Sequence, residues 1–238
     1  MSYESKYLKY RNKYLSLKNI LQIGGSSVNS GIVPDPSVSE ALPIRQRADI
    51  FNERVNPLIF VFDCDYTIWP FDCDGRREND VRFPYIRRPD GNVFDANGKP
   101  ANPYPEVPYI LGALYDAGIQ VTFASRNPSV RQVYQLLNAI PMKSKQGCLS
   151  LLDSMRNNYG FLQAYDSGEN NKLVHFNKIK EVTKIDFNNM VFFDDNINNV
   201  EHAETLGVIS VLLSKQTGLT WDAVDNALDR WRARGYGI

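Results

Sequence analysis

Histidine and cysteine are scarce in this chain of 238 residues, which contains two histidines and three cysteines. The cysteines Cys64, Cys73 and Cys148 form no even-numbered set and have no metal-ligand spacing. The sequence therefore predicts neither a disulfide framework nor a zinc site, and it favours a reducing compartment. His175 and His202 are single histidines within helical patterns, and we expect both to be structural.

Long apolar runs and net charge are also missing. No run approaches the length of a transmembrane helix, and the N-terminal tract lacks the apolar region of a signal peptide, so we expect a cytoplasmic protein. The formal net charge is zero, but residues 1–23 hold five basic residues and one acidic residue, a net charge of +4. The remaining residues therefore sum to −4, which disfavours nucleic acid as a partner of the main body.

Composition divides the chain into three segments. Residues 1–23 form a predicted basic amphipathic helix, for which packing on the body, self-association and contact with an anionic surface all stay open. Residues 24–53 are rich in Ser, Gly and Pro and are predicted to be a flexible linker. Residues 54–238 are predicted to form one compact domain. The helical stripe of the first segment alternates spacings of four and three: Tyr3, Tyr7, Tyr10, Tyr14, Leu17 and Leu21.

Strand and helix patterns alternate through the third segment. Apolar runs predict strands at 57–63, 119–125, 161–166, 189–195 and 208–213. Amphipathic patterns predict helices at 106–118, 129–140, 173–185 and 221–234. This alternation indicates an α/β fold with a doubly wound parallel sheet and helices on both faces. Turn signals at Asp90-Gly91 and Asn97-Gly98 predict a small hairpin flap, and no large cap domain fits before residue 125.

Polar side chains gather where the predicted strands end. Asp63 and Asp65 end the first strand, Ser125 and Arg126 the second, and Asp194 and Asp195 the strand at 189–195. Each group taken alone also suits a turn or a helix cap. Together, however, they meet at the carboxyl edge of the sheet, where ligands of such folds bind. Carboxylates that converge repel one another, and oxygen ligands without histidine or thiolate favour Mg²⁺ as the cofactor.

These motifs resemble those of a known enzyme family. "DCDYT", Ser125, Lys172 and "DD" resemble the four motifs of the haloacid-dehalogenase-like phosphatases. "VFDCDYTIWPF", "YPEVPYIL", "ASRN", "KLVHF" and "MVFFDDNINNV" are similar to its magnesium-dependent phosphatase-1 branch, over residues 57–230. The N-terminal tract resembles basic leaders on proteins of large double-stranded DNA viruses. This resemblance would imply that the protein is located in the host cytoplasm or in the virion.

The resemblance implies a role for each matched residue. Asp63 would be the nucleophile, and Asp65 would be general acid and then general base. Thr67 would orient the first loop beside the substrate, while Ser125, Arg126 and Lys172 would bind substrate or its phosphoryl group. The resemblance also implies a metal site, whose ligands would be Asp63, Asp194 and the main-chain carbonyl of Asp65, supported by Asp195 and Asn199.

One segment departs from the family pattern. Residues 141–171 look longer than their counterpart, so Lys143, Lys145 and Lys178 rival Lys172 for its role, and the extra residues are candidates for a partial lid. Cys64 is expected to point away from the two aspartates by strand alternation. No C-x5-R loop is present, which disfavours a cysteine-phosphatase mechanism.

The sequence thus predicts a Mg²⁺-dependent phosphomonoesterase that acts through an aspartyl-phosphate. Phosphotyrosine or another phosphoprotein side chain, a sugar phosphate and a small metabolite all fit an open site. Two alternatives stay open: a nucleic-acid end phosphatase, and a binding module that keeps the fold without turnover.

Overall fold

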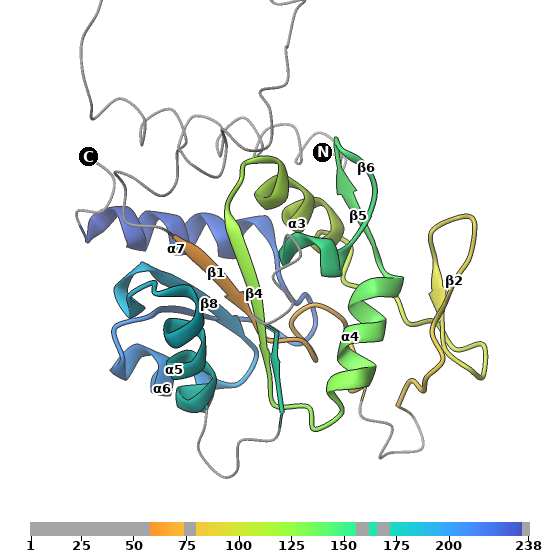
Figure 1. The fold of residues 1–238 in the computed structure, drawn as a ribbon, viewed down its shortest axis with the longest axis horizontal. Coiled ribbons are helices and arrows are strands. Elements are labelled where there is room, and N and C mark those ends of the chain that lie inside the picture. The colour runs from red at the N-terminus through yellow and green to blue at the C-terminus, as the bar shows by residue number, and fades with distance from the viewer. Residues whose placement is uncertain (1–57, 74–79, 156–161, 166–171, 235–238) are drawn as a thin grey trace, which may run out of the picture.

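The structure is a computed structural model that describes residues 58–73, 80–155, 162–165 and 172–234 (Figure 1). The predicted N-terminal helix and linker lie outside the described residues. Within the described part, five parallel strands form one sheet in the order β7-β4-β1-β8-β9. Their bounds are β1 Ile59–Phe62, β4 Gln120–Ser125, β7 Gln163–Ala164, β8 Met190–Asp194 and β9 Ile209–Leu212. The expected doubly wound α/β fold is confirmed.

Alternation along β1 divides the core into two layers. Phe60 and Phe62 face one cluster of buried residues, whereas Ile59 and Val61 face the other. The first layer is covered by α3 Val107–Asp116, α4 Val130–Ala139 and α7 Trp221–Ala233, and the second by α5 Lys172–Thr183 and α6 Ile197–Thr205. A strand whose two faces are both buried favours a continuous apolar run, which is why β1 was visible in the sequence.

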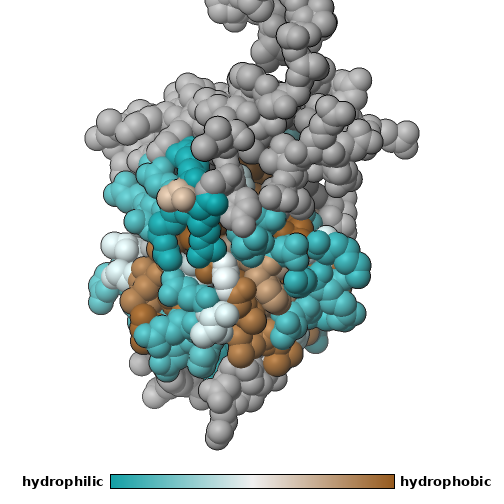
Figure 2. All heavy atoms as spheres, turned by 90° about the vertical axis from the view of Figure 1, so that its left-hand side faces the viewer, coloured by the Kyte–Doolittle hydropathy of each residue, from teal (hydrophilic) through white to brown (hydrophobic). Residues whose placement is uncertain are grey.

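The outer face that includes α5 and α6 is mostly polar, with apolar side chains scattered over it (Figure 2). Val174, Val182 and Ile197 are among its exposed apolar residues. None of the described helices combines the length and the apolar character that crossing a membrane requires.

The predicted flap is a two-stranded antiparallel hairpin, with β2 at Ile86–Arg87 and β3 at Val93–Phe94. Asp95 closes its second turn, because its carboxylate accepts hydrogen bonds from the main-chain N–H groups of Arg82, Asn97 and Lys99. Backbone donors of this kind favour the charged carboxylate, and they outweigh burial to hold the pKa of Asp95 below its ordinary value.

Several elements were not predicted. Helix α6 spans Ile197–Thr205, and a second hairpin consists of β5 Pro141–Ser144 and β6 Gly147–Ser150, followed by the 3-10 helix Leu151–Met155. A further 3-10 turn, Phe187–Asn189, precedes β8. The tip of the second hairpin meets the end of α3, where Ser144 Oγ donates to Asp116 Oδ1 at 2.7 Å.

The position of that hairpin bears on the suggested lid. Asp116 ends α3 four residues before β4 begins at Gln120, so the hairpin tip lies toward the amino end of β4. Ser125 and the other strand-end residues lie at the opposite edge of the sheet. The hairpin β5–β6 therefore packs on α3, and its tip lies away from that edge.

Candidate active site

The predicted strand-end residues meet because their strands are neighbours. β1 lies between β4 and β8, in parallel register with both, so Asp63, Ser125 and Asp194 fall at the same edge of the sheet. The ladder continues into the first loop, where the N–H of Asp63 donates to the carbonyl of Phe193 at 3.0 Å. Main-chain pairing thus fixes where the first carboxylate stands.

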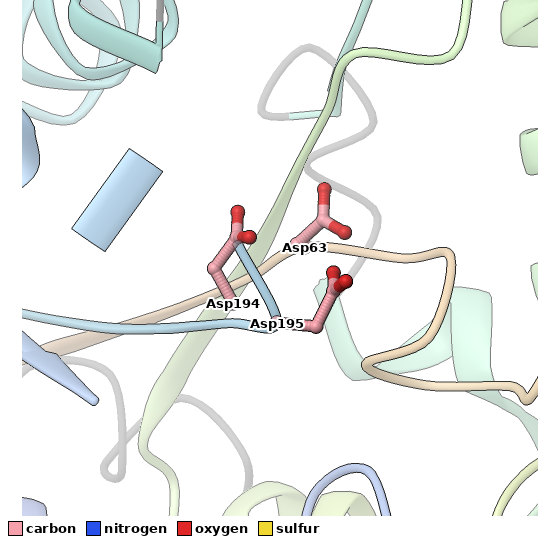
Figure 3. A group of neighbouring side chains, drawn as sticks. All are labelled: Asp63, Asp194 and Asp195. Carbon is pink, nitrogen blue, oxygen red and sulfur yellow. The ribbon is translucent and has the colours of Figure 1, made fainter. Parts of the chain in front are cut away.

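Three carboxylates form a cluster at this edge. One oxygen from each of Asp63, Asp194 and Asp195 lies within 4.8 Å of the others, and the three groups turn toward a common space (Figure 3). Burial raises the pKa of Asp63, and Asp194 adds to the rise although Lys172 opposes it. Burial and Asp194 also raise the pKa of Asp195. Raised pKa values mean that the charged forms of these carboxylates are disfavoured, and a hard divalent cation would stabilise those charged forms. The residues present therefore fit Mg²⁺.

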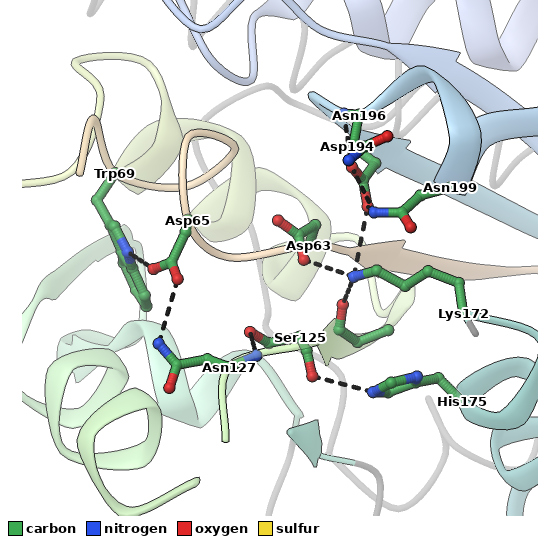
Figure 4. A network of polar contacts seen from close by, with 11 residues as sticks. Asp63, Asp65, Trp69, Ser125, Asn127, Lys172, His175, Asp194, Asn196 and Asn199 are labelled. Carbon is green, nitrogen blue, oxygen red and sulfur yellow. Dashed lines mark hydrogen bonds and ion pairs between the residues drawn. The ribbon is translucent and has the colours of Figure 1, made fainter. Parts of the chain in front are cut away.

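Lys172 reaches this cluster from inside the domain (Figure 4). Its Nζ lies 2.5 Å from Asp63 Oδ1 and 3.3 Å from Asp194 Oδ2, and it also donates to the carbonyl of Ala124. The side chain is fully buried. Burial alone would lower the pKa of Lys172, but Asp63 and Asp194 outweigh it and hold that pKa above its ordinary value.

The three rival lysines lie elsewhere. Lys143 and Lys145 belong to the hairpin on α3. Lys178 is exposed on α5, where it pairs with Glu181 at 2.9 Å. The geometry therefore favours Lys172 over all three.

Asp65 occupies a different environment from Asp63. Its Oδ1 accepts a hydrogen bond from Trp69 Nε1 at 2.7 Å, and its Oδ2 accepts one from Asn127 Nδ2 at 3.2 Å (Figure 4). Burial raises the pKa of Asp65 to about 6, although both hydrogen bonds oppose the rise. Asp65 therefore retains a proton over more of the pH range than an exposed aspartate does.

Residues around the second and fourth motifs are held by local hydrogen bonds. Ser125 is buried, and its Oγ accepts from the N–H of Asn127 at 3.2 Å. Asn199 Nδ2 donates to both carboxylate oxygens of Asp194, at 3.1 and 3.0 Å, and the N–H of Asn196 donates to one of them at 2.8 Å. These contacts fix the direction in which the Asp194 carboxylate points.

Thr67 and Arg126 differ in exposure. Thr67 is fully buried, and its carbonyl accepts from the N–H of Leu219 at 3.0 Å, which suits support of the first loop. Arg126 is exposed beside Ser125.

Sequence reasoning missed one contribution. Asn127, the last residue of the quoted "ASRN" motif, received no role, although it is 5% exposed and contacts Asp65. His175 was expected to be structural, and it is fully buried, with Nε2 2.9 Å from the Ser125 carbonyl and its ring stacked on Tyr165 at 4.3 Å. The motif "ASRN" was the available signal for Asn127, but its contact partner depended on the fold.

Comparison with known proteins identifies the family. The acid phosphatase family model matches residues 55–234, and the chain belongs to this family. It is 31% identical over 173 residues to magnesium-dependent phosphatase 1 of Homo sapiens, covering 73% of this chain and 86% of that protein. It is 28% identical over 165 residues to a HAD-like hydrolase superfamily protein of Schizosaccharomyces pombe, covering 68% of this chain and 89% of that protein. The family that the motifs indicated is thereby confirmed.

Proposed function

We propose that this chain is a Mg²⁺-dependent phosphomonoesterase that forms an aspartyl-phosphate on Asp63. The observation that supports this most is that the two neighbouring aspartates, Asp63 and Asp65, lie in different surroundings. Burial raises the pKa of both aspartates, but Asp63 lies among carboxylates and a buried ammonium, whereas Asp65 lies among neutral N–H donors. One group is placed to attack and the other to exchange a proton.

In the first step, a carboxylate oxygen of Asp63 attacks phosphorus and the bond from phosphorus to the ester oxygen breaks. Asp65 gives its proton to that oxygen, so the leaving group departs as an alcohol. In the second step, water attacks phosphorus, Asp65 takes a proton from the water, and the bond to Asp63 breaks to release inorganic phosphate. Splitting one displacement into two lets a single carboxylate act as acid and then as base.

The chain's own residues hold the phosphoryl group and the metal in this proposal. Lys172 and Ser125 bind the phosphoryl oxygens, and the hydrogen bonds of Asn199 keep Asp194 oriented. Asp63 and Asp194 hold Mg²⁺, and Asp195, which clusters with them, joins the main-chain carbonyl of Asp65 as a candidate further ligand. The ion, when bound, would neutralise charge on the transferring group.

The substrate is proposed only as a class. A small flap, without a large cap among the described residues before Ser125, leaves room for a phosphoprotein side chain, a sugar phosphate or a small metabolite. The net negative charge of the body disfavours a nucleic-acid end as the substrate. The presence of every motif residue supports turnover of such monoesters.

The decisive test replaces the nucleophile. Purified protein with Mg²⁺ is expected to hydrolyse an aryl phosphate and to trap beryllium fluoride on Asp63, and Asp63→Asn should lose both. Asp229→Asn is the matched control, because Asp229 is exposed on α7 in a surface pair with Arg232. Full turnover by Asp63→Asn would exclude the proposed intermediate, and an inactive wild type that still binds Mg²⁺ would favour the silent binding module.

A further inference from the structure

The loop of residues 213–219, which follows β9, is tied to both aspartate-bearing loops. The N–H of Leu213 donates to the carbonyl of Asp194 at 2.8 Å, and the N–H of Leu219 donates to the carbonyl of Thr67 at 3.0 Å. Between them, the hydroxyl of Tyr104 donates to the carbonyl of Lys215. The loop is therefore held at both ends and at Lys215 itself.

Lys215 directs its ammonium group at the rim of the carboxylate cluster. Its Nζ lies 3.1 Å from Asp195 Oδ2 and 4.7 Å from the centre of the Tyr66 ring. The Lys215 side chain is 58% exposed, whereas that of Asp195 is 10% exposed. The ammonium thus stands on the solvent side of the cluster.

The two lysines of the site differ in what they can bind. Lys172 is enclosed beside Asp63 and Asp194, where it can meet the phosphoryl group but not a distant part of the leaving group. Lys215 is the exposed partner of its ion pair with Asp195, and a cation held by Asp195 would weaken that pair. Its charge is consequently available to an anion that arrives from solvent.

Geometry indicates which part of a substrate would meet it. In a displacement at phosphorus the attacking and leaving oxygens lie roughly in line, so attack by Asp63 directs the leaving group away from β1. Asp63 is buried at the end of that strand, whereas Lys215 is exposed beside Asp195 at the rim of the cluster, so a leaving group that points to solvent can approach Lys215.

We propose that Lys215 is a specificity-determining residue that binds a second anionic group, such as a carboxylate, on the leaving group of a phosphate monoester. The inference rests on the proposed phosphatase function and narrows its substrate class. Tyr66 and Asp195 hold the ammonium in place before substrate arrives, and such preorganisation reduces the loss of side-chain freedom on binding.

The test compares phenyl phosphate with its carboxyphenyl analogue, two substrates that differ by one carboxylate. In Lys215→Met the kcat/KM for the carboxyphenyl ester should fall about 10-fold more than that for phenyl phosphate, as expected for one charge-assisted hydrogen bond. Lys180→Met is the matched control, because Lys180 also combines an ion pair, 2.8 Å to Asp186, with a ring contact, 4.7 Å to Phe187, on the surface of α5. Lys180→Met should leave kcat/KM unchanged for both substrates.

Equal losses of kcat/KM on both esters in Lys215→Met, or no loss on either, would overturn the proposal. A preference for the carboxyphenyl ester that disappears in Arg126→Met and persists in Lys215→Met would also overturn it. Calorimetric binding of phenylphosphonate and carboxyphenylphosphonate to the Mg²⁺-loaded protein separates this inference from the chemistry. Preference for the carboxylated phosphonate in the wild type, lost in Lys215→Met, supports the inference even if no ester is hydrolysed, in which case the proposed function alone fails.

Discussion

Asp63 and Asp65 are separated by a single residue, yet their carboxylates meet different partners. Asp63 meets the buried ammonium of Lys172 and two further aspartates, and Asp65 meets the indole of Trp69 and the amide of Asn127. The sequence showed the two aspartates and their family, because the motif is local. It did not show the role of Asn127, because that contact joins residues 62 positions apart and exists only once β1 and β4 are paired.

Asn127→Ala should impair the proton transfer that Asp65 is proposed to make, because Asp65 Oδ2 loses the amide that orients it. We expect kcat for an alkyl phosphate to fall about 10-fold, the loss typical of one hydrogen bond to a charged group. A nitrophenyl ester should suffer less, since its leaving group departs without a proton. Steady-state kinetics on the two esters, together with beryllium fluoride trapping on Asp63, measure this difference.

Asn138→Ala, at an exposed position on α4, is the matched control and should leave both rates at the wild-type level. Equal losses on the two esters in Asn127→Ala would contradict a role through Asp65 and would indicate a general loss of structure.

At the scale of elements, the second hairpin is joined to α3 by close packing at one glycine. A Cβ placed on Gly112 would lie 2.0 Å from the carbonyl oxygen of Lys143 and 2.5 Å from its carbon. Both neighbours are main-chain atoms, so neither can move without shifting β5. Glycine is therefore required at this position because the main chain of Lys143 packs against it, and not because glycine favours helix formation.

Gly112→Ala should consequently lower the free energy of unfolding, by about 1 to 3 kcal/mol. The sign of this change is informative, because replacing glycine by alanine at an ordinary helix position stabilises the helix by about 1 kcal/mol. Urea denaturation measures the change. Asn138→Ala provides the reference for an exposed helical position and should not destabilise, and a stabilised Gly112→Ala protein would show that the hairpin does not pack on α3 as described.

The elements differ in how well the sequence revealed them. Strands β1, β4, β8 and β9 were predicted to within two residues at each end. Burial on both faces leaves long apolar runs in β1, β4 and β8, and the edge strand β9 is also apolar. Helix α6 was missed because its sequence, "INNVEHAET", is mostly polar and buries only Asn199, Val200 and Ala203. The hairpin β5–β6 was missed because its contacts with α3 are long-range, and its sequence, "PMKSKQGCLS", has no regular apolar alternation.

At the scale of the whole molecule, we expect stability and metal binding to be coupled through the carboxylate cluster. Two like charges about 4 Å apart repel by about 4 kcal/mol at the effective dielectric near a protein surface. The folded domain brings three such groups together, whereas the unfolded chain separates them. A cation that binds only the folded cluster relieves this repulsion and shifts the unfolding equilibrium.

Adding Mg²⁺ to protein treated with a chelator should therefore raise the melting temperature. At 100 times the dissociation constant the gain is about 2.7 kcal/mol. Asp194→Asn should lose most of this gain, whereas Asp229→Asn should keep it, and differential scanning calorimetry with and without Mg²⁺ measures both. An unchanged Mg²⁺-dependent shift in Asp194→Asn would place the ion elsewhere. The assignments of residues 1–23 and 24–53 stay predictions at this scale.

The parallel pairing of β1 with β8 has a consequence for which ion the site admits. Asp63 and Asp194 each follow the matched pair Phe62 and Phe193, so the separation of their main chains is set by the sheet, where neighbouring strands lie about 4.8 Å apart. Mg²⁺ demands short bonds and near-octahedral geometry, whereas Ca²⁺ accepts longer and more varied ones. If Asp63 and Asp194 hold Mg²⁺ as proposed, the paired strands set how closely the two carboxylates approach the ion. Core substitutions that spread these two strands should then weaken the preference for Mg²⁺ over Ca²⁺, although neither aspartate is changed.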